Sequence, residues 1–190
     1  MVKCIYYFQG DHVLKRINTS EIKNAAKDLV AGEEILLSGI VYTARDAAHK
    51  RIMTMIENGE PLPFDINGAV IYYAGPTQSK NGYATGSCGP TTSIRMDSFT
   101  PKLLDMGLGA TIGKGNRSDE VKEAIVRNGS VYLCAIGGAG ALACACIKSS
   151  EVIAFDDLGC ESIKKMVFED FPLFVAIDAN GRNIFKRRNK

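Results

Sequence analysis

Short apolar segments of strand length recur along this chain with helical patterns between them, and this mixture limits the possible folds. Glu34–Thr43 and Gly68–Ala74 are largely apolar and are typical of buried strands. Ala44–Asn58 carries apolar residues at helical spacing and is followed by Gly59, a common helix stop. Because strands and helices follow one another without strict alternation, we expect a mixed α/β fold in which a layered mixed sheet packs against helices.

Caps and turn residues place the other elements. Ser118 precedes a helical segment with an acidic start, Asp119–Asn128, and Gly129 ends it. Ile163–Phe168 is apolar and fits a strand or a helix. The further predicted elements are strands at Val2–Phe8, His12–Ile17, Ala110–Ile112, Val131–Ile136, Glu151–Phe155, Leu173–Asp178 and Asn183–Phe185, helices from Thr19 or Ser20 to about Leu29, at Lys102–Met106 and after Gly140, and a hairpin turn at Ala179–Gly181.

Composition limits the function classes. The length of 190 residues and a hydrophobic content of 46% suit one domain with a sizeable core. The net charge is +2 and no block of like charge occurs, so we expect no nucleic-acid partner. The longest apolar run near the N-terminus, Cys4–Phe8, is too short for a signal peptide or a membrane span. We therefore expect a cytoplasmic protein, without a membrane partner, whose six cysteines are reduced.

The segment Gly86–Asp97 is the strongest candidate for a functional site. Its glycines force a non-repetitive backbone, and Pro90 suits the first position of a helix. Thr91 and Thr92 are then expected in the first helical turn beside unpaired backbone amides, with Arg95 on the same face as Thr91. Hydroxyls, amides and a guanidinium together favour a carboxylate or phosphate ligand. The alternative is a capped surface helix with a solvated arginine.

A second candidate lies at the start of the helix predicted at Ala44–Asn58. Arg45 falls in its first turn, where a cation opposes the helix dipole, and this misfit indicates an anion-binding role. His49 follows one turn later on the same side. We interpret His49 as an imidazole at the edge of the core, hydrogen-bonded to the backbone, in preference to a catalytic group.

Glycine patterns and cysteines suggest further candidate sites, of which we keep only the one at Lys114. Lys114 stands between two glycines in a predicted turn, which would expose its charge. The pattern Ile112–Lys114 lacks the other residues of a P-loop, and Gly138–Ala143 is interpreted as close helix packing in preference to a nucleotide site. None of the cysteines forms a Cys-x-x-Cys pair, so we expect no metal bound by this chain alone.

Several blocks, in the same order, resemble the class I (iron–sulfur) fumarate hydratase family. They are Thr43–Arg51, Ile71–Pro76, Gly89–Asp97, Ile112–Gly115 and Glu169–Pro172. The resemblance is to the C-terminal domain of that family, which is also the β subunit of two-chain fumarases and of L-tartrate dehydratase. Separate blocks in a conserved order are more specific than any one motif.

This resemblance implies a swivelling β/β/α domain. Its core would be residues 18–185 of a single domain spanning 1–190, with an N-terminal extension at 1–17 and a basic tail at 186–190. It also implies that a partner α subunit holds a [4Fe–4S] cluster, one iron of which acts as a Lewis acid on the substrate hydroxyl. The expected assembly is a hetero-oligomer of α2β2 type.

The resemblance also implies roles for single residues. Arg45, Arg95 and Lys114 are the cations expected to bind the carboxylates of a dicarboxylate substrate, and they would stabilise the charge that develops as a carbon-bound proton leaves. Thr91 matches the position of the proposed base, and Thr92 should hydrogen-bond the substrate. A hydroxyl is a weak base and needs activation, and a plain helix cap is the alternative for Thr91.

The function expected from these observations is that of the β subunit of a class I fumarate hydratase, which hydrates fumarate reversibly to (S)-malate. Two alternatives stay open. One is the β subunit of L-tartrate dehydratase, whose substrate differs by one hydroxyl. The other is a carboxylate-binding domain without catalytic activity.

Overall fold

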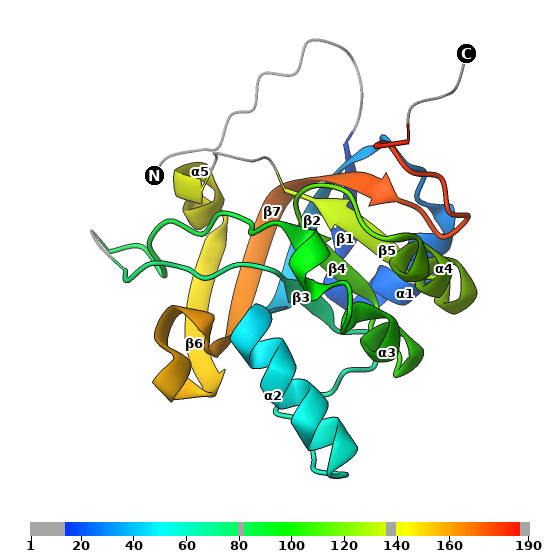
Figure 1. Ribbon diagram of the computed structural model, residues 1–190. Coiled ribbons are helices and arrows are strands. Elements are labelled where there is room, and N and C mark those ends of the chain that lie inside the picture. Colours follow the sequence, from blue (N-terminus) through cyan, green and yellow to red (C-terminus); the bar gives the residue numbers. More distant parts are fainter. Residues whose placement is uncertain (1–13, 80–81, 136–139, 187–190) are drawn as a thin grey trace.

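The computed structural model describes residues 14–79, 82–135 and 140–186 (Figure 1), so the strand predicted at Val2–Phe8 lies outside the described residues. Sheet, α-helices and short 3-10 helices (η) are mixed along the chain, which confirms the mixed α/β class. The elements are β1 (Lys15–Asn18), η1 (Thr19–Glu21), α1 (Ile22–Ala25), η2 (Ala26–Asp28), β2 (Glu34–Thr43), α2 (Asp46–Glu57), β3 (Val70–Tyr72), η3 (Ser93–Met96), α3 (Thr100–Asp105), β4 (Ala110–Gly113), α4 (Asp119–Asn128), β5 (Val131–Cys134), α5 (Gly140–Ala145), β6 (Ile147–Ala154), η4 (Asp156–Glu161) and β7 (Ile163–Ile177).

The strands form one sheet in the order β1-β2-β3-β4-β5-β7-β6. Strands β1 to β5 pair in parallel with their neighbours, whereas β7 is antiparallel to β5, β6 and β2. Because β7 pairs with both β5 and β2, the strands β2, β3, β4, β5 and β7 close into a ring. A closed ring removes exposed edges from these five strands.

Strand β7 differs from the prediction. The ambiguous segment Ile163–Phe168 and the predicted strand Leu173–Asp178 are two parts of one 15-residue strand. The strand continues through a bulge opposite Leu37 and Gly39, where Asp170 adopts a positive φ of 47° and its amide donates to Ser38 Oγ (3.0 Å). The bulge bends this long strand, so that β7 can pair with both β2 and β5 and close the ring.

The two faces of the ring strands contribute to two cores. In β3, Val70 and Tyr72 point into the cluster enclosed by the strands, and Ile71 belongs to the cluster beneath the helices, followed by Tyr73 on the same side. Helices α2, α3 and α4 cover this second cluster (Figure 1). Burial on both faces explains why β3 to β5 are nearly continuous apolar runs.

Caps predicted from local sequence hold for α4. The Ser118 hydroxyl accepts a hydrogen bond from the Val121 amide (3.4 Å), and Gly129 ends the helix at φ 60°. The helix predicted from Thr19 or Ser20 is three short turns, and Asn18 caps it through the Ser20 amide (3.0 Å). Asn18 is therefore the cap, because the extended residue before the turn is the one whose side chain reaches the free amide.

A hairpin-like contact also matches the expectation. Ile177 and Asn183 form an antiparallel bridge across the turn predicted at Ala179–Gly181. Among the described residues no helix is long and apolar enough to cross a membrane. The swivelling movement stays a prediction.

Candidate active site

The carboxyl ends of neighbouring parallel strands gather the predicted site residues. Strand β2 leads into Arg45, β3 into Gly75, and β4 into Lys114. Because β2, β3 and β4 are parallel neighbours, these ends lie at the same edge of the sheet. Ligands of α/β proteins commonly bind beyond this edge.

The prediction of a helix that starts at Pro90 is wrong. Pro90 forms an antiparallel bridge with Ala74, the Thr91 amide donates to the Tyr73 carbonyl (2.7 Å), and Thr92 bridges Lys114. The backbone is thus extended and belongs to the sheet edge. Backbone pairing with β3 and β4 competes with the helix, and the fixed φ of proline is compatible with both conformations.

The 3-10 helix η3 begins at Ser93, with Thr92 as the residue before it. Thr91 and Thr92 are therefore not in a first helical turn, and the Thr91 amide is not available to an anion. The alternative of a helix cap fails for the same reason, since no side-chain hydrogen bond caps η3. Thr91 and Arg95 do not share a helical face, yet both remain at this edge of the sheet.

The same pairing brings the threonines to Lys114. The Ser93 amide donates to the Lys114 carbonyl and the Lys114 amide donates to Ser93 Oγ, each at 3.0 Å. The Lys114 side chain is exposed beside them. Gly113 makes this contact possible, because a Cβ at that position would overlap Ser93 Oγ and lie 3.0 Å from the Tyr73 ring.

Gly113→Ala should therefore lower the free energy of unfolding by about 1–3 kcal/mol, as overpacking does elsewhere. Thermal unfolding measures this effect. Gly89→Ala is a matched control within the same sheet edge, since its Cβ would meet Gly140 Cα at an ordinary 3.7 Å. Equal melting temperatures for the two variants would contradict the close approach of Ser93 to Gly113.

Arg45 precedes α2 and is not in its first turn, which corrects the prediction. It adopts an extended conformation (φ −120°), and its guanidinium packs against Gly75, where a Cβ would lie 2.8 Å from Nη1. Nη2 lies 3.4 Å from Glu161 Oε1, and Glu161 also accepts the Ala47 amide (3.0 Å). The charge of Arg45 is thus balanced by a carboxylate that also serves the start of α2.

Asp46 joins the two predicted arginines. Arg95 Nε donates to Asp46 Oδ1 (2.9 Å), and Arg45 Nη2 lies 3.9 Å from Asp46 Oδ2. The Arg95 side chain is 50% exposed and that of Arg45 21%. Two cations from separate segments of the chain therefore meet at one carboxylate, and the sequence did not single out Asp46 or Glu161.

His49 is hydrogen-bonded to the backbone, as interpreted, but it lies inside the core and not at its edge. It is fully buried between the rings of Tyr73 and Phe99, with centroid distances of 5.5 and 5.6 Å. Nδ1 lies 2.9 Å from the Arg45 carbonyl, so this nitrogen carries the proton. Burial lowers the pKa of His49 to about 4, and the imidazole is neutral at neutral pH.

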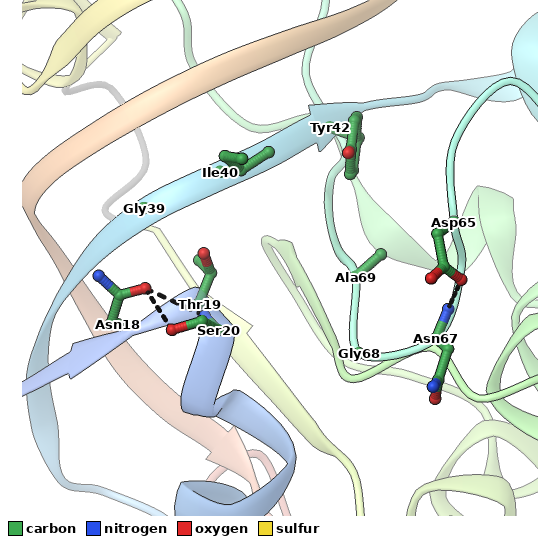
Figure 2. Close-up of a pocket in the computed structure, with 10 residues that line it drawn as sticks. All are labelled: Asn18, Thr19, Ser20, Gly39, Ile40, Tyr42, Asp65, Asn67, Gly68 and Ala69. Atoms are coloured by element: carbon green, nitrogen blue, oxygen red, sulfur yellow. Dashed lines mark hydrogen bonds between the residues drawn. The ribbon is translucent and has the colours of Figure 1, made fainter.

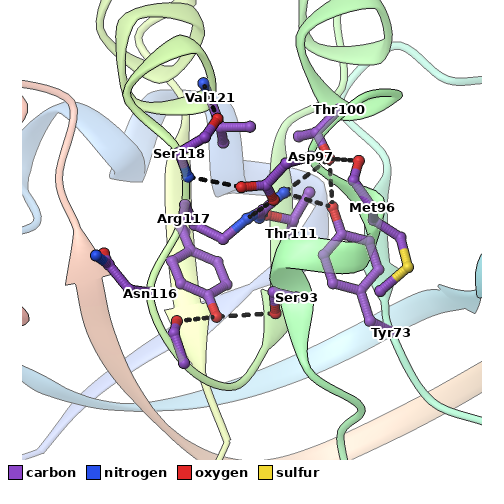
Figure 3. Close-up of polar contacts among 12 residues, drawn as sticks. Tyr73, Ser93, Met96, Asp97, Thr100, Thr111, Asn116, Arg117, Ser118 and Val121 are labelled. Atoms are coloured by element: carbon purple, nitrogen blue, oxygen red, sulfur yellow. Dashed lines mark hydrogen bonds and ion pairs between the residues drawn. The ribbon is translucent and has the colours of Figure 1, made fainter.

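Figure 3 shows a buried ion pair that the sequence did not predict, between Arg117 and Asp97. Arg117 Nε donates to Asp97 Oδ1 (2.6 Å), and its Nη2 donates to Thr100 Oγ1 (2.7 Å). The guanidinium also lies over the rings of Tyr73 and Tyr132, at 5.3 and 4.9 Å. Since its side chain is 0% exposed, the pair is a fixed internal contact.

The pair links the two loops that carry predicted site residues. Asp97 ends the segment with Thr91 and Arg95, and Arg117 follows the turn with Lys114. Asp97 Oδ2 also accepts the Ser118 amide (2.6 Å), which ties the loop to the start of α4. Removing one partner of such a buried pair leaves an uncompensated charge, so both loops depend on it.

The buried cysteines of the described residues are poor candidates for the ligands of a [4Fe–4S] cluster. Among the described residues, no group of three or more histidine, cysteine or acidic side chains could hold a metal ion. Burial raises the pKa of the Cys88 thiol to about 12 and also raises that of Cys134. Cluster ligands are thiolates, and burial opposes their formation.

The other glycine pattern lies partly outside the described residues. Gly140 begins α5 and packs closely on the site segment, because a Cβ there would lie 3.1 Å from the Gly89 amide nitrogen. The Cys88 amide donates to the Gly140 carbonyl (3.1 Å). The predicted close packing is therefore present at Gly140, and the segment that Gly140 packs against is the one at Gly89.

A separate cavity of about 270 Å³ contains none of the predicted site residues (Figure 2). It lies between the end of β1, the middle of β2 and the turn before β3. Burial, and then the charge of Asp65, raise the pKa of Tyr42 at its wall. Its lining residues are Asn18, Thr19, Ser20, Gly39, Ile40, Tyr42, Asp65, Asn67, Gly68 and Ala69.

The fold and the gathered side chains define a mixed α/β domain with cationic groups at the ends of its parallel strands. The profile of the family described as Fumarase C-terminus matches residues 8–188, and the chain belongs to this family.

Its relatives are of two kinds. "Fumarate hydratase 2" of Leishmania major is 40% identical over 169 residues, which cover 88% of this chain and 30% of that protein. "Fumarate hydratase class I, aerobic" of Escherichia coli K12 is 44% identical over 154 residues, covering 80% and 28%. "L(+)-tartrate dehydratase subunit beta" of E. coli K12 is 33% identical over 183 residues, covering 93% and 90%.

The chain therefore spans less than a third of the fumarate hydratases and nearly the whole of a tartrate dehydratase β subunit. The names of these relatives are those of hydro-lyases, which add or remove water.

Proposed function

We propose that this chain is the β subunit of a two-subunit class I fumarate hydratase, which adds water reversibly to fumarate to give (S)-malate in the cytoplasm. The observation that carries the proposal is the meeting of Arg45 and Arg95 at Asp46, at the same sheet edge as Thr91 and Lys114. Two arginines, a lysine and two hydroxyls suit a dicarboxylate better than an apolar ligand.

The chemistry assigns a task to each side chain. Malate is a dianion, and its dehydration removes a weakly acidic proton from the carbon beside a carboxylate. In the proposal, Arg45, Arg95 and Lys114 bind the carboxylates and stabilise the negative charge that develops as this proton leaves. Thr91 first gives its hydroxyl proton to a base outside this chain; as the alkoxide it takes the substrate proton and returns it in the hydration direction, while Thr92 hydrogen-bonds the substrate. Nearby cations lower the pKa of a hydroxyl and so supply part of the activation that Thr91 needs.

The metal chemistry is assigned to a partner. Class I fumarate hydratases depend on an iron–sulfur cluster, and the buried thiols of Cys88 and Cys134, whose pKa values burial raises, are poor candidates for its ligands. We therefore propose an α subunit that holds a [4Fe–4S] cluster and completes the site, in an α2β2 assembly. The cluster would supply a Lewis acid for the substrate hydroxyl.

L-Tartrate is the second candidate substrate. The specific observation in its favour is that the chain covers 90% of the E. coli tartrate dehydratase β subunit. Tartrate carries one more hydroxyl than malate, and the same cations and threonines would serve both. A carboxylate-binding domain without catalysis is the remaining alternative.

Purified alone under anaerobic conditions, the chain should fold, carry no stoichiometric iron or sulfide, and show no hydratase activity. Co-expressed with its cluster-bearing partner, it should yield an enzyme that converts malate faster than tartrate. Iron and sulfide analysis and side-by-side assays on the two substrates measure these outcomes.

A preference for tartrate would select the second candidate, and a complex inactive on both would favour a binding domain. Stoichiometric iron in the isolated chain would contradict the assignment of the cluster to a partner.

A further inference from the structure

One short segment holds the buried polar atoms that the fold leaves without a hydrogen bond. Within residues 14–79, 82–135 and 140–186, these side-chain atoms are Arg45 Nε, Asp46 Oδ2 and His49 Nε2. Buried polar atoms are nearly always paired in folded proteins, and exceptions concentrate where function requires them. The start of α2 thus holds polar groups whose hydrogen-bonding capacity is not used by the described residues.

Asp46 is central to this segment. It is the first residue of α2, and its side chain is 24% exposed. One carboxylate oxygen accepts from Arg95 Nε (2.9 Å), and the other faces Arg45 Nη2 (3.9 Å). Arg45 is fixed further by Glu161 (3.4 Å) and by the backbone at Gly75.

The way in which Asp46 binds Arg95 leaves a defined edge of the guanidinium for a ligand. The bond to Asp46 uses Nε, so the edge between the two Nη groups is the one that a carboxylate can meet in bidentate geometry. Without Asp46, a half-exposed arginine would sample many rotamers.

We infer that Asp46 is a positioning residue that holds Arg45 and Arg95 in a fixed arrangement for the carboxylates of the substrate. The inference rests on the proposed function. Asp46 acts through the two arginines and takes no part in the proton transfer.

Simple electrostatics predicts the opposite effect of removing Asp46. A carboxylate near the site repels a dianionic substrate, so its neutralisation alone would tighten binding and lower KM. Positioning predicts a loss instead, because small misplacements of binding groups cost much of the rate. The sign of the change therefore separates the two accounts.

The test uses Asp46→Asn in the assembled enzyme, with malate and tartrate as substrates. We expect kcat/KM on the active substrate to fall by about tenfold or more. Asp119→Asn is the control: Asp119 is the first residue of α4 and pairs with Lys186 (2.9 Å), a residue to which the proposal gives no role. Both variants lose a carboxylate from a helix start, but Asp46 is the less exposed of the two, so Asp46→Asn should lower the melting temperature more, and only the control should keep its activity.

A double variant tests the route of the effect. If Asp46 acts through Arg95, then Asp46→Asn should lower kcat/KM less in an Arg95→Ala background than in the wild type. Additive losses, or a kcat/KM for Asp46→Asn within about twofold of the wild type, would overturn the inference while leaving the proposed function intact. A wild-type complex inactive on both substrates would overturn the proposed function itself.

Discussion

Arg45→Ala and Arg95→Ala, each in the assembled enzyme, should lower kcat/KM about a hundredfold or more. This corresponds to a loss of about 3 kcal/mol of transition-state stabilisation. The reason is that each removes a donor aimed at a carboxylate on which charge develops. The two guanidiniums belong to different segments, yet both lie against Asp46. Steady-state assays on the active substrate measure the loss.

Arg51→Ala is the matched control. Like Arg45, Arg51 connects α2 to an acidic residue of η4, and its pair with Asp157 is exposed. Exposed ion pairs contribute little to stability, so this variant should keep both its fold and its activity. If Arg45→Ala or Arg95→Ala stayed within about threefold of wild-type activity, that arginine would not be a carboxylate ligand.

The expected cost in stability differs between the two arginines. Arg95 is half-exposed and, within the described part of the chain, pairs with Asp46 alone, so its loss should leave the melting temperature nearly unchanged. Arg45 is 21% exposed and faces Glu161 and Asp46, which would both lose a cationic neighbour. A moderate loss of stability in Arg45→Ala is therefore compatible with its role, and Arg95→Ala provides the cleaner measurement.

Local signals predicted the elements whose ends are fixed by their own residues. Helix α4 begins after Ser118 and stops at Gly129, because a cap and a left-handed glycine act within one turn of the chain. Strand β2 has the bounds Glu34–Thr43 that its apolar run predicted.

Contacts from far along the chain decided the rest. The segment at Pro90 has good helix signals, but its backbone pairs with Ala74 and Lys114, which no local pattern reveals. Strand β7 pairs with β2, which lies more than a hundred residues earlier, and its bulge hides the continuity of the strand from the sequence. Tertiary pairing overrides local propensity in both cases.

The acidic partners of the site arginines were missed for a similar reason. Arg45 lies 116 residues before Glu161, and Arg95 lies 49 residues after Asp46. Arg117 and Asp97 are buried, although charged residues usually lie on the surface. The sequence does place charged residues beside the site motifs. This adjacency, however, does not show which arginine each carboxylate pairs with.

Thr91→Ala in the assembled enzyme should lower kcat by about a hundredfold or more, the usual range for a positioned proton-transfer group. Its melting temperature should stay close to that of the wild type. Thr91 lies before η3 and holds its place through its backbone amide, which donates to the Tyr73 carbonyl (2.7 Å) and is retained in alanine. A helix-cap role would predict a stability loss of about 1 kcal/mol instead, and the helix start at Ser93 argues against it.

Exchange of a substrate hydrogen isolates the proton step from binding. Malate incubated with the wild-type enzyme in deuterated water should take up deuterium at C3, and Thr91→Ala should lose this exchange together with turnover. Thr91→Ser keeps the hydroxyl and should retain part of both. Thr54→Ala is the control, because it removes an exposed hydroxyl from α2 that bonds the Lys50 carbonyl (3.2 Å). Normal turnover in Thr91→Ala would remove this residue from the mechanism, whereas lost turnover with normal exchange would assign the base to another group.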